Sequence, residues 1–176
     1  MSGAGGETPL GEIVSSYDPA APLEDAWTIP ASWYVDRRVA ELERRTVFSN
    51  SWQLVGRADQ VAAPGAFVTT EIAGEPIVAI RGADGVLRAF FNVCRHHAAA
   101  VMTEPEGEAK VLRCPYHGWT YGLDGRLKGT PDFAGVCNFD KGSTGLVPVQ
   151  VAEWENWVFV KLDEGGPSFE EFVGGD

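Results

Sequence analysis

The sequence contains few of the features that mark cross-linked or membrane-bound proteins. It has three cysteines, and an odd number this small excludes the fully paired framework of a secreted disulfide-rich domain. No apolar run is long enough to cross a bilayer, and positions 1–11 lack the basic start and apolar stretch of a signal peptide. We therefore expect a cytoplasmic protein in a reducing compartment, with no membrane partner.

Basic residues are scarce as well. Fourteen Lys and Arg residues stand against 25 Asp and Glu residues, which gives a formal net charge of −11. Phosphate backbones repel such a chain, so nucleic acid is not an expected partner. With 176 residues, of which 44% are hydrophobic, the chain is long enough for one domain with a buried core, and a second full domain would not fit.

Composition divides the chain into four parts. Positions 1–28 are rich in Gly and Pro and predict a flexible N-terminal tail. Positions 29–52 carry apolar residues at helical spacing between charged ones, which predicts a short helical lead-in of one or two amphipathic helices. Positions 53–162 predict the main domain, and positions 163–176, again rich in Gly, predict a linker to a domain that is absent from this chain.

The main domain has a β pattern throughout. Short runs rich in Val, Ile, Phe, Thr and Trp alternate with turn residues. Asp84-Gly85 and Asp124-Gly125 tolerate the positive φ of tight hairpin turns, which favours antiparallel pairing. The expected fold is mostly β, an antiparallel sandwich or small barrel. The expected strands are 53–56, 67–72, 75–81, 86–93, 110–113, 147–153 and 157–162.

All three histidines lie close to two of the cysteines. Cys94-x-His96 and Cys114-x-x-His117 form two Cys/His pairs, and each pair follows an expected strand, so each is expected on a loop. Two loops with one thiolate and one imidazole apiece make a tetrahedral Cys₂His₂ set around one metal, or divide by ligand type between two metals. The spacing predicts a metal site without naming the metal.

The residues around these pairs are similar to the two cluster-binding loops of Rieske [2Fe-2S] proteins. The similar segments are Asn92-Val93-Cys94-Arg95-His96-His97-Ala98 and Cys114-Pro115-Tyr116-His117-Gly118-Trp119-Thr120-Tyr121. The resemblance implies a Rieske-type β-sandwich with a two-loop cluster-binding subdomain, in which Cys94 and Cys114 bind one iron. It implies that His96 and His117 bind the other iron, with two sulfides between the irons. Tyr116 stands beside His117 and no further cysteine follows His96, so the disulfide of high-potential Rieske proteins is missing, as in oxygenases and Rieske ferredoxins.

The lead-in carries a second resemblance. Positions 29–57 are similar to the N-terminal part of the large subunit of Rieske non-haem iron oxygenases, and the similarity continues to position 162. The runs Cys94-x-His-His97 and Tyr121-Gly-Leu-Asp-Gly125 are similar to the branch that includes choline monooxygenase. The resemblance implies that an NAD(P)H-dependent reductase or a ferredoxin reduces the cluster. The cluster would then pass electrons to a mononuclear Fe(II) in the catalytic domain of a neighbouring subunit, within a trimer.

The number of histidines limits what this chain does alone. The mononuclear iron needs two histidines in addition to the two cluster ligands, and the chain has three in all. We therefore expect the Rieske domain of an oxygenase large subunit, present as a fragment or a truncated gene product, that transfers one electron and catalyses nothing by itself. Two alternatives stay open: an independent Rieske ferredoxin carrier, and a zinc-stabilised binding module without redox activity.

Four neighbouring residues have simpler expected roles. His97 is expected to pack or form hydrogen bonds beside the ligands rather than to coordinate. Cys137 has no partner and is expected to be a small buried hydrophobic residue. Trp119 and Tyr121 are expected to pack beneath the second loop. The outer nitrogens of the two ligand imidazoles are expected to face solvent at a protruding tip.

Overall fold

The computed structural model describes residues 7–174. It divides the chain into two compact units, Met1–Val47 and Phe48–Asp176. Within residues 7–174, no helix is long and apolar enough to cross a membrane.

The first unit is helical over much of its described length. Its elements are α1 (Leu10–Ser15), α2 (Ala31–Val35), α3 (Arg37–Glu43) and all but the last residue of a π-helical turn, η1 (Arg44–Phe48). Asp36 begins α3, because its carboxylate accepts a hydrogen bond from the backbone N–H of Arg38. Helix α1 lies in the expected tail, where Ile13 is buried and its carbonyl accepts a 2.9 Å hydrogen bond from Trp33 Nε1. The expected tail thus contains one short helix. Residues 1–6 of the tail lie outside the described residues.

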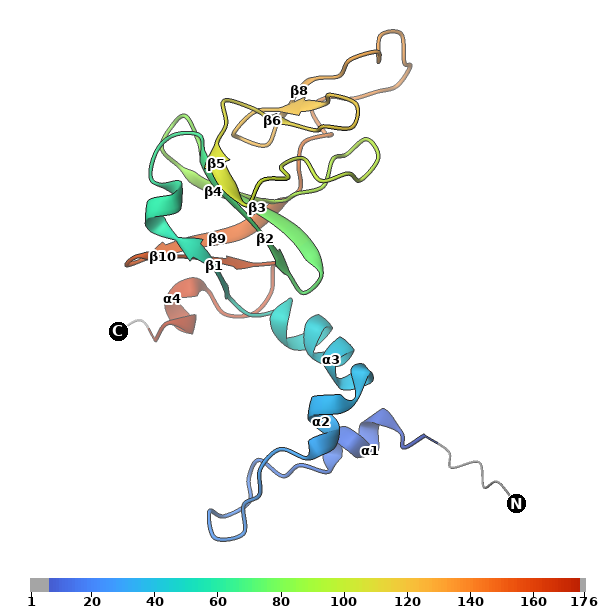
Figure 1. Cartoon of the computed structure of the whole chain (residues 1–176), viewed down its shortest axis with the longest axis vertical. Coiled ribbons are helices and arrows are strands. Elements are labelled where there is room, and N and C mark those ends of the chain that lie inside the picture. The colour runs from blue at the N-terminus through green and yellow to red at the C-terminus, as the bar shows by residue number, and fades with distance from the viewer. Residues whose placement is uncertain (1–6, 175–176) are drawn as a thin grey trace, which may run out of the picture. The chain divides into compact units, whose positions relative to one another are not determined.

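The second unit is built on a curled antiparallel sheet of seven strands (Figure 1). The strands lie in the order β1-β10-β9-β4-β3-β2-β5. They are β1 (Gln53–Arg57), β2 (Ala66–Ile72), β3 (Glu75–Arg81), β4 (Leu87–Phe91), β5 (Glu106–Glu108), β9 (Pro148–Trp154) and β10 (Trp157–Lys161). A 3₁₀ helix, η2 (Ala58–Val61), follows β1. Six of the seven strands were expected and are confirmed; β5, a Glu-Gly-Glu segment at the sheet edge, carries no apolar pattern and was missed.

A second sheet has three short strands. They are β6 (Leu112–Arg113), β7 (Thr120–Tyr121) and β8 (Leu127–Gly129), in that order. The strand expected at 110–113 is shorter than predicted, and β7 and β8 were not expected. Segments of two or three residues are too short to show an alternating pattern. The mostly antiparallel β fold is confirmed.

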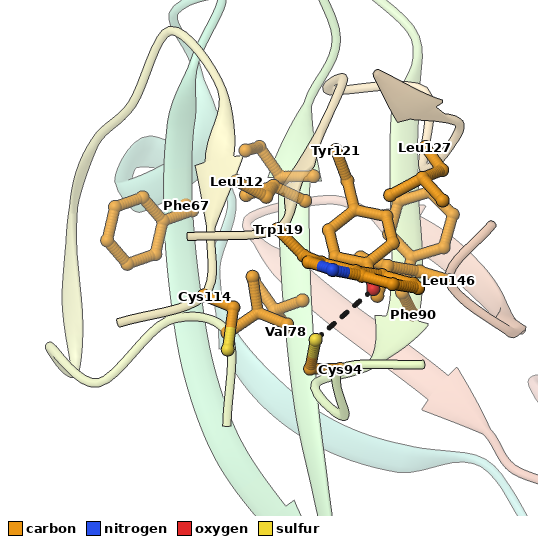
Figure 2. Close-up of a cluster of buried hydrophobic side chains, with 12 residues drawn as sticks. Phe67, Val78, Phe90, Cys94, Leu112, Cys114, Trp119, Tyr121, Leu127 and Leu146 are labelled. Atoms are coloured by element: carbon orange, nitrogen blue, oxygen red, sulfur yellow. Dashed lines mark hydrogen bonds between the residues drawn. The ribbon is translucent and has the colours of Figure 1, made fainter. Parts of the chain in front are cut away.

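Central strands of the large sheet are buried on both faces. On β3, Ile77 and Ala79 contribute to the core inside the curled sheet, whereas Val78 and Ile80 contribute to a second core. This two-sided burial explains why residues 77–80 form an unbroken apolar run instead of an alternating one. The second core also contains both loop cysteines and residues of the small sheet (Figure 2). The two loops are therefore anchored by apolar packing on the sheet.

The described part of the expected linker 163–176 is tied to the sheet. It contains one helical turn, α4 (Phe169–Phe172), which begins at Ser168, whose hydroxyl accepts from the N–H three residues on. Phe169 packs edge-on against Trp52, with ring centroids 5.0 Å apart. The buried amine of Lys161 donates a 3.1 Å hydrogen bond to the carbonyl of Pro167. These contacts give the segment an ordered path that its composition did not predict.

Candidate functional site

The two loops that carry the Cys/His pairs, 94–99 and 114–119, have the same backbone arrangement. In each loop the cysteine N–H donates to the carbonyl five residues on, at 2.8 Å. In each, the cysteine carbonyl accepts from the N–H four residues on, at 3.0 Å. That fourth residue has a positive φ, 58° at Ala98 and 72° at Gly118. The two loops therefore have equivalent backbone conformations, although they come from different parts of the sequence.

The predicted ligands separate by chemical type. Cys94 and Cys114 are 3% and 2% exposed, belong to the second core and are both free thiols. His96, His97 and His117 gather at the less buried side, with one ring nitrogen of each within 4.8 Å of the others. No thiol of the described residues joins that imidazole group. The separation favours a division by ligand type between two metals over one Cys₂His₂ ion.

The surroundings of His96 fit a metal group. Its Nδ1 is buried and has no hydrogen-bond partner among the described residues, although buried polar atoms are normally paired. Partial burial, and then the imidazoles of His97 and His117, lower the pKa of His96. A lower pKa favours the neutral ring, which is the form that coordinates a metal. The expectation of solvent-facing imidazoles holds for the exposed ring of His117, whereas His96 is half-buried.

Tyr121 connects the small sheet to the first loop. Its fully buried hydroxyl accepts a 2.9 Å hydrogen bond from the backbone N–H of Arg95 and lies 3.3 Å from the Sγ of Cys94 (Figure 2). Because the oxygen accepts from Arg95, its own proton is free to point at the sulfur. Burial, and then the contact with Cys94, raises the pKa of Tyr121, so this hydroxyl stays a donor. Tyr121 was expected to pack under the second loop, and its polar contact with the first was missed.

Asn92 closes the first loop at its base. Its amide Nδ2 donates to the carbonyl of Met102 at 2.7 Å, and its Oδ1 accepts from the N–H groups of Val101 and Met102 at 3.1 and 2.9 Å. The side chain is almost fully buried. Three hydrogen bonds therefore tie the start of the loop to its end. The sequence does not predict this role, because its one signal is a polar residue directly after an apolar strand.

Aromatic rings pack on both candidate imidazoles. His97 packs on His96 with ring centroids 3.9 Å apart, and Tyr116 packs on His117 at the same distance. Trp119 is buried, as expected, and stacks on His96 at 4.6 Å with an interplanar angle of 6°. His97 also lies in the group of three ring nitrogens, so its non-coordinating role stays a prediction.

Cys137 does not match its prediction. It was expected to be buried, and it is exposed. It lies in a bend of the long connection from β8 to β9, where Gly135 and Asn138 adopt positive φ. A turn of this kind keeps the thiol at the surface, outside the second core.

Comparison with known proteins identifies the type of domain. The family model "Rieske [2Fe-2S] domain" matches residues 51–140. The carnitine monooxygenase oxygenase subunit of Escherichia coli (strain K12) is 42% identical over 153 residues, which are 86% of this chain and 41% of that protein. The chloroplastic choline monooxygenase of Arabidopsis thaliana is 37% identical over 153 residues, 87% of this chain and 36% of that protein. The expected similarity to the choline monooxygenase branch is confirmed.

A solved structure agrees with the sequence matches. The quaternary ammonium Rieske monooxygenase CntA in complex with L-carnitine superposes with a TM-score of 0.80 at 39% identity. The match covers 85% of this chain and 43% of that one. The chain thus spans less than half the length of the relatives that it matches.

Proposed function

The chain belongs to the Rieske [2Fe-2S] domain family, and from this we propose that it serves as the electron-transfer domain of an oxygenase subunit. We propose four residues as the cluster ligands: Cys94, His96, Cys114 and His117. The observation that carries this proposal is the pair of equivalent loops, which bring two buried thiols and the imidazoles to one place while keeping the two ligand types apart.

The cluster, when bound, stores and releases one electron at a time. The chain's own residues set the conditions for that step. Two neutral imidazoles in place of two thiolates reduce the negative charge around the irons, which raises the reduction potential above that of an all-cysteine ferredoxin. The Tyr121 hydroxyl is placed to stabilise negative charge on the Cys94 sulfur. Apolar packing of the second core excludes water from the thiol side.

The electron acceptor is proposed to be a mononuclear iron outside this chain. The chain has three histidines, and two of them are the proposed cluster ligands, so one is left where a two-histidine, one-carboxylate site needs two. We propose that a reductase or ferredoxin that draws on NAD(P)H supplies the electron and that a catalytic domain receives it, within a trimer of the complete subunit. The relatives' names, carnitine and choline monooxygenase, support this direction of transfer to an oxygenase. A reducing compartment fits the free thiols of the site.

The test is an electron paramagnetic resonance spectrum of the dithionite-reduced protein, with iron and acid-labile sulfide measured on the same sample. We expect a Rieske-type signal and about two irons and two sulfides per chain. The variant Cys114→Ser should lose both, whereas Cys137→Ser, an equal change at an exposed free thiol, should keep both. A colourless protein that contains zinc instead would support the structural zinc module. An intact cluster in a protein that reduces no oxygenase domain would support the independent carrier.

A further inference from the structure

Two arginines beside the loops differ from the other arginines of the second unit. Four of those arginines form ion pairs with carboxylates: Arg57, Arg81, Arg88 and Arg126. Arg95 and Arg113 are exposed, and neither forms an ion pair with any residue in the described range 7–174. Arg95 directly follows one loop cysteine and Arg113 directly precedes the other. The unpaired guanidinium groups of this unit therefore flank the candidate cluster site.

Each of these arginines lines a hollow next to the imidazoles. Arg95 lines one of about 440 Å³ together with His96 and His97. Arg113 lines another of about 940 Å³, together with His96 and His117. Each hollow also includes one acidic residue, Glu75 in the first and Asp132 in the second, and neither acid forms an ion pair with the arginine. A guanidinium left unpaired is available to a carboxylate from another molecule, which it can bind with two parallel hydrogen bonds.

The charge of the chain makes this location unusual. The segment 92–146, which holds both loops, has as many basic as acidic residues, so the whole net charge of −11 resides outside it. The segment that carries the loops therefore repels an acidic partner less than the rest of the chain does. Such a field favours encounters at the place where the imidazoles are exposed.

We propose that Arg95 and Arg113 form the contact for an acidic surface on the redox protein that delivers electrons to the cluster. This inference rests on the proposed electron-transfer function and adds the chemistry of the partner. The step served by the contact is a one-electron transfer: the donor loses one electron, the cluster gains it, and no bond is made or broken. The arginines hold the donor's carboxylates, and the exposed ring of His117 lies at the same face.

A first experiment measures the local charge with small redox reagents. The reduced protein is oxidised by ferricyanide, an anion, and by hexaammineruthenium(III), a cation, at several ionic strengths. A positive site makes the ferricyanide rate fall as salt is added, whereas control by the net charge of −11 makes it rise. We expect the double variant Arg95→Gln/Arg113→Gln to lower the ferricyanide rate by about threefold to tenfold at low salt and to raise the hexaammineruthenium rate.

Arg57→Gln is the control, because it removes one positive charge, half of the change in the double variant, from an exposed arginine at the end of β1 that is paired with Asp59. We expect it to change both rates by less than about twofold. The reduction potential and iron content of every variant are measured alongside, so that a change in driving force is separated from a change in encounter.

A second experiment uses a protein donor, an acidic plant-type [2Fe-2S] ferredoxin mixed with the oxidised chain in a stopped-flow instrument. We expect the second-order rate to fall with salt and to fall by about tenfold in the double variant, but not in Arg57→Gln. If only ferricyanide responds to the arginines, they form a small-anion site and the docking contact is overturned. Rates that rise with salt for both anionic reactants, ferricyanide and the acidic ferredoxin, overturn it as well. A chain that holds no cluster overturns the proposed function and this contact together, whereas an intact cluster with unchanged rates overturns the contact alone.

Discussion

Removing the Tyr121 hydroxyl tests how this chain sets the potential of its cluster. In Tyr121→Phe the ring and its packing stay, because the side chain is fully buried and only one oxygen is lost. The loss removes the donor 3.3 Å from the Cys94 sulfur and the acceptor of the Arg95 N–H. We expect a lower reduction potential, since the reduced state carries more negative charge on sulfur and gains more from a donor.

The magnitude follows from the strength of one hydrogen bond. If the bond is stronger by about 1 kcal/mol in the reduced state, its loss lowers a one-electron potential by about 40 mV, because 59 mV corresponds to a tenfold change, or about 1.4 kcal/mol. The unpaired Arg95 N–H should also reduce the free energy of unfolding by about 1 kcal/mol. Burial raises the pKa of Tyr121, so the hydroxyl keeps its proton and the difference in potential should be the same at about pH 6 and pH 9.

The assay is a redox titration of both proteins, followed by circular dichroism, with Tyr116→Phe as the control. Tyr116 is 65% exposed and lies in the equivalent loop beside His117, so the same chemical change there removes a hydroxyl that faces water. We expect the control to change the potential by less than about 10 mV. An unchanged potential in Tyr121→Phe, with full iron content, would show that the hydroxyl does not act on the sulfur.

Three further predictions concern the loops and the first unit. Asn92→Leu keeps the branched shape and the number of side-chain heavy atoms but leaves three buried or part-buried backbone groups without their side-chain partner, so thermal or chemical unfolding should show a loss of stability of about 3 kcal/mol. Ala98→Gly removes a left-handed alanine with φ 58° and should stabilise the protein by about 0.5 to 1 kcal/mol in the same assay; an equal loss of stability would show that the alanine methyl group is needed. In the first unit, hydrogen bonds from the Arg38 side chain, and then from its backbone N–H, lower the pKa of Asp36 from 3.8 to about 2. The ionised Asp36 carboxylate therefore stabilises α3 above about pH 4, and this stabilisation is lost as the pH falls towards 2. Amide exchange across α3 should show this acid dependence in the wild type but not in Asp36→Asn.

The parts of the fold that the sequence predicts are those governed by local pattern. Strand β3 and its neighbours show runs of β-branched and aromatic residues bounded by turn residues, and their ends lie within two residues of the expected ones. The candidate ligands were found in the same way, because Cys and His at short, unequal spacing are rare outside metal sites. Both kinds of signal are contained in a few consecutive residues.

The features that were missed depend on contacts between distant residues. Asn92 reaches backbone groups nine and ten residues away, and an asparagine in isolation predicts only a turn. Tyr121 meets Cys94 across 27 residues, and nothing in either local sequence indicates the pairing. Helix α1 is held by Trp33, 20 residues on, so its own composition still reads as a tail. Local pattern therefore predicts the candidate ligands but not the groups that orient them.

The unequal spacing of the two Cys/His pairs has a structural explanation in the equal loops. Both loops have the same backbone hydrogen bonds, so their positions can be compared by counting from the cysteine. A histidine two residues after the cysteine then lies at a different position of the turn from a histidine three residues after it. His96 takes the second position in its loop and His117 takes the third in the other. The remaining positions are filled by His97 and Tyr116, each of which packs on its neighbouring imidazole with centroids 3.9 Å apart. The offset thus gives each proposed ligand a supporting ring from its own loop, which limits its rotation without occupying its free nitrogen.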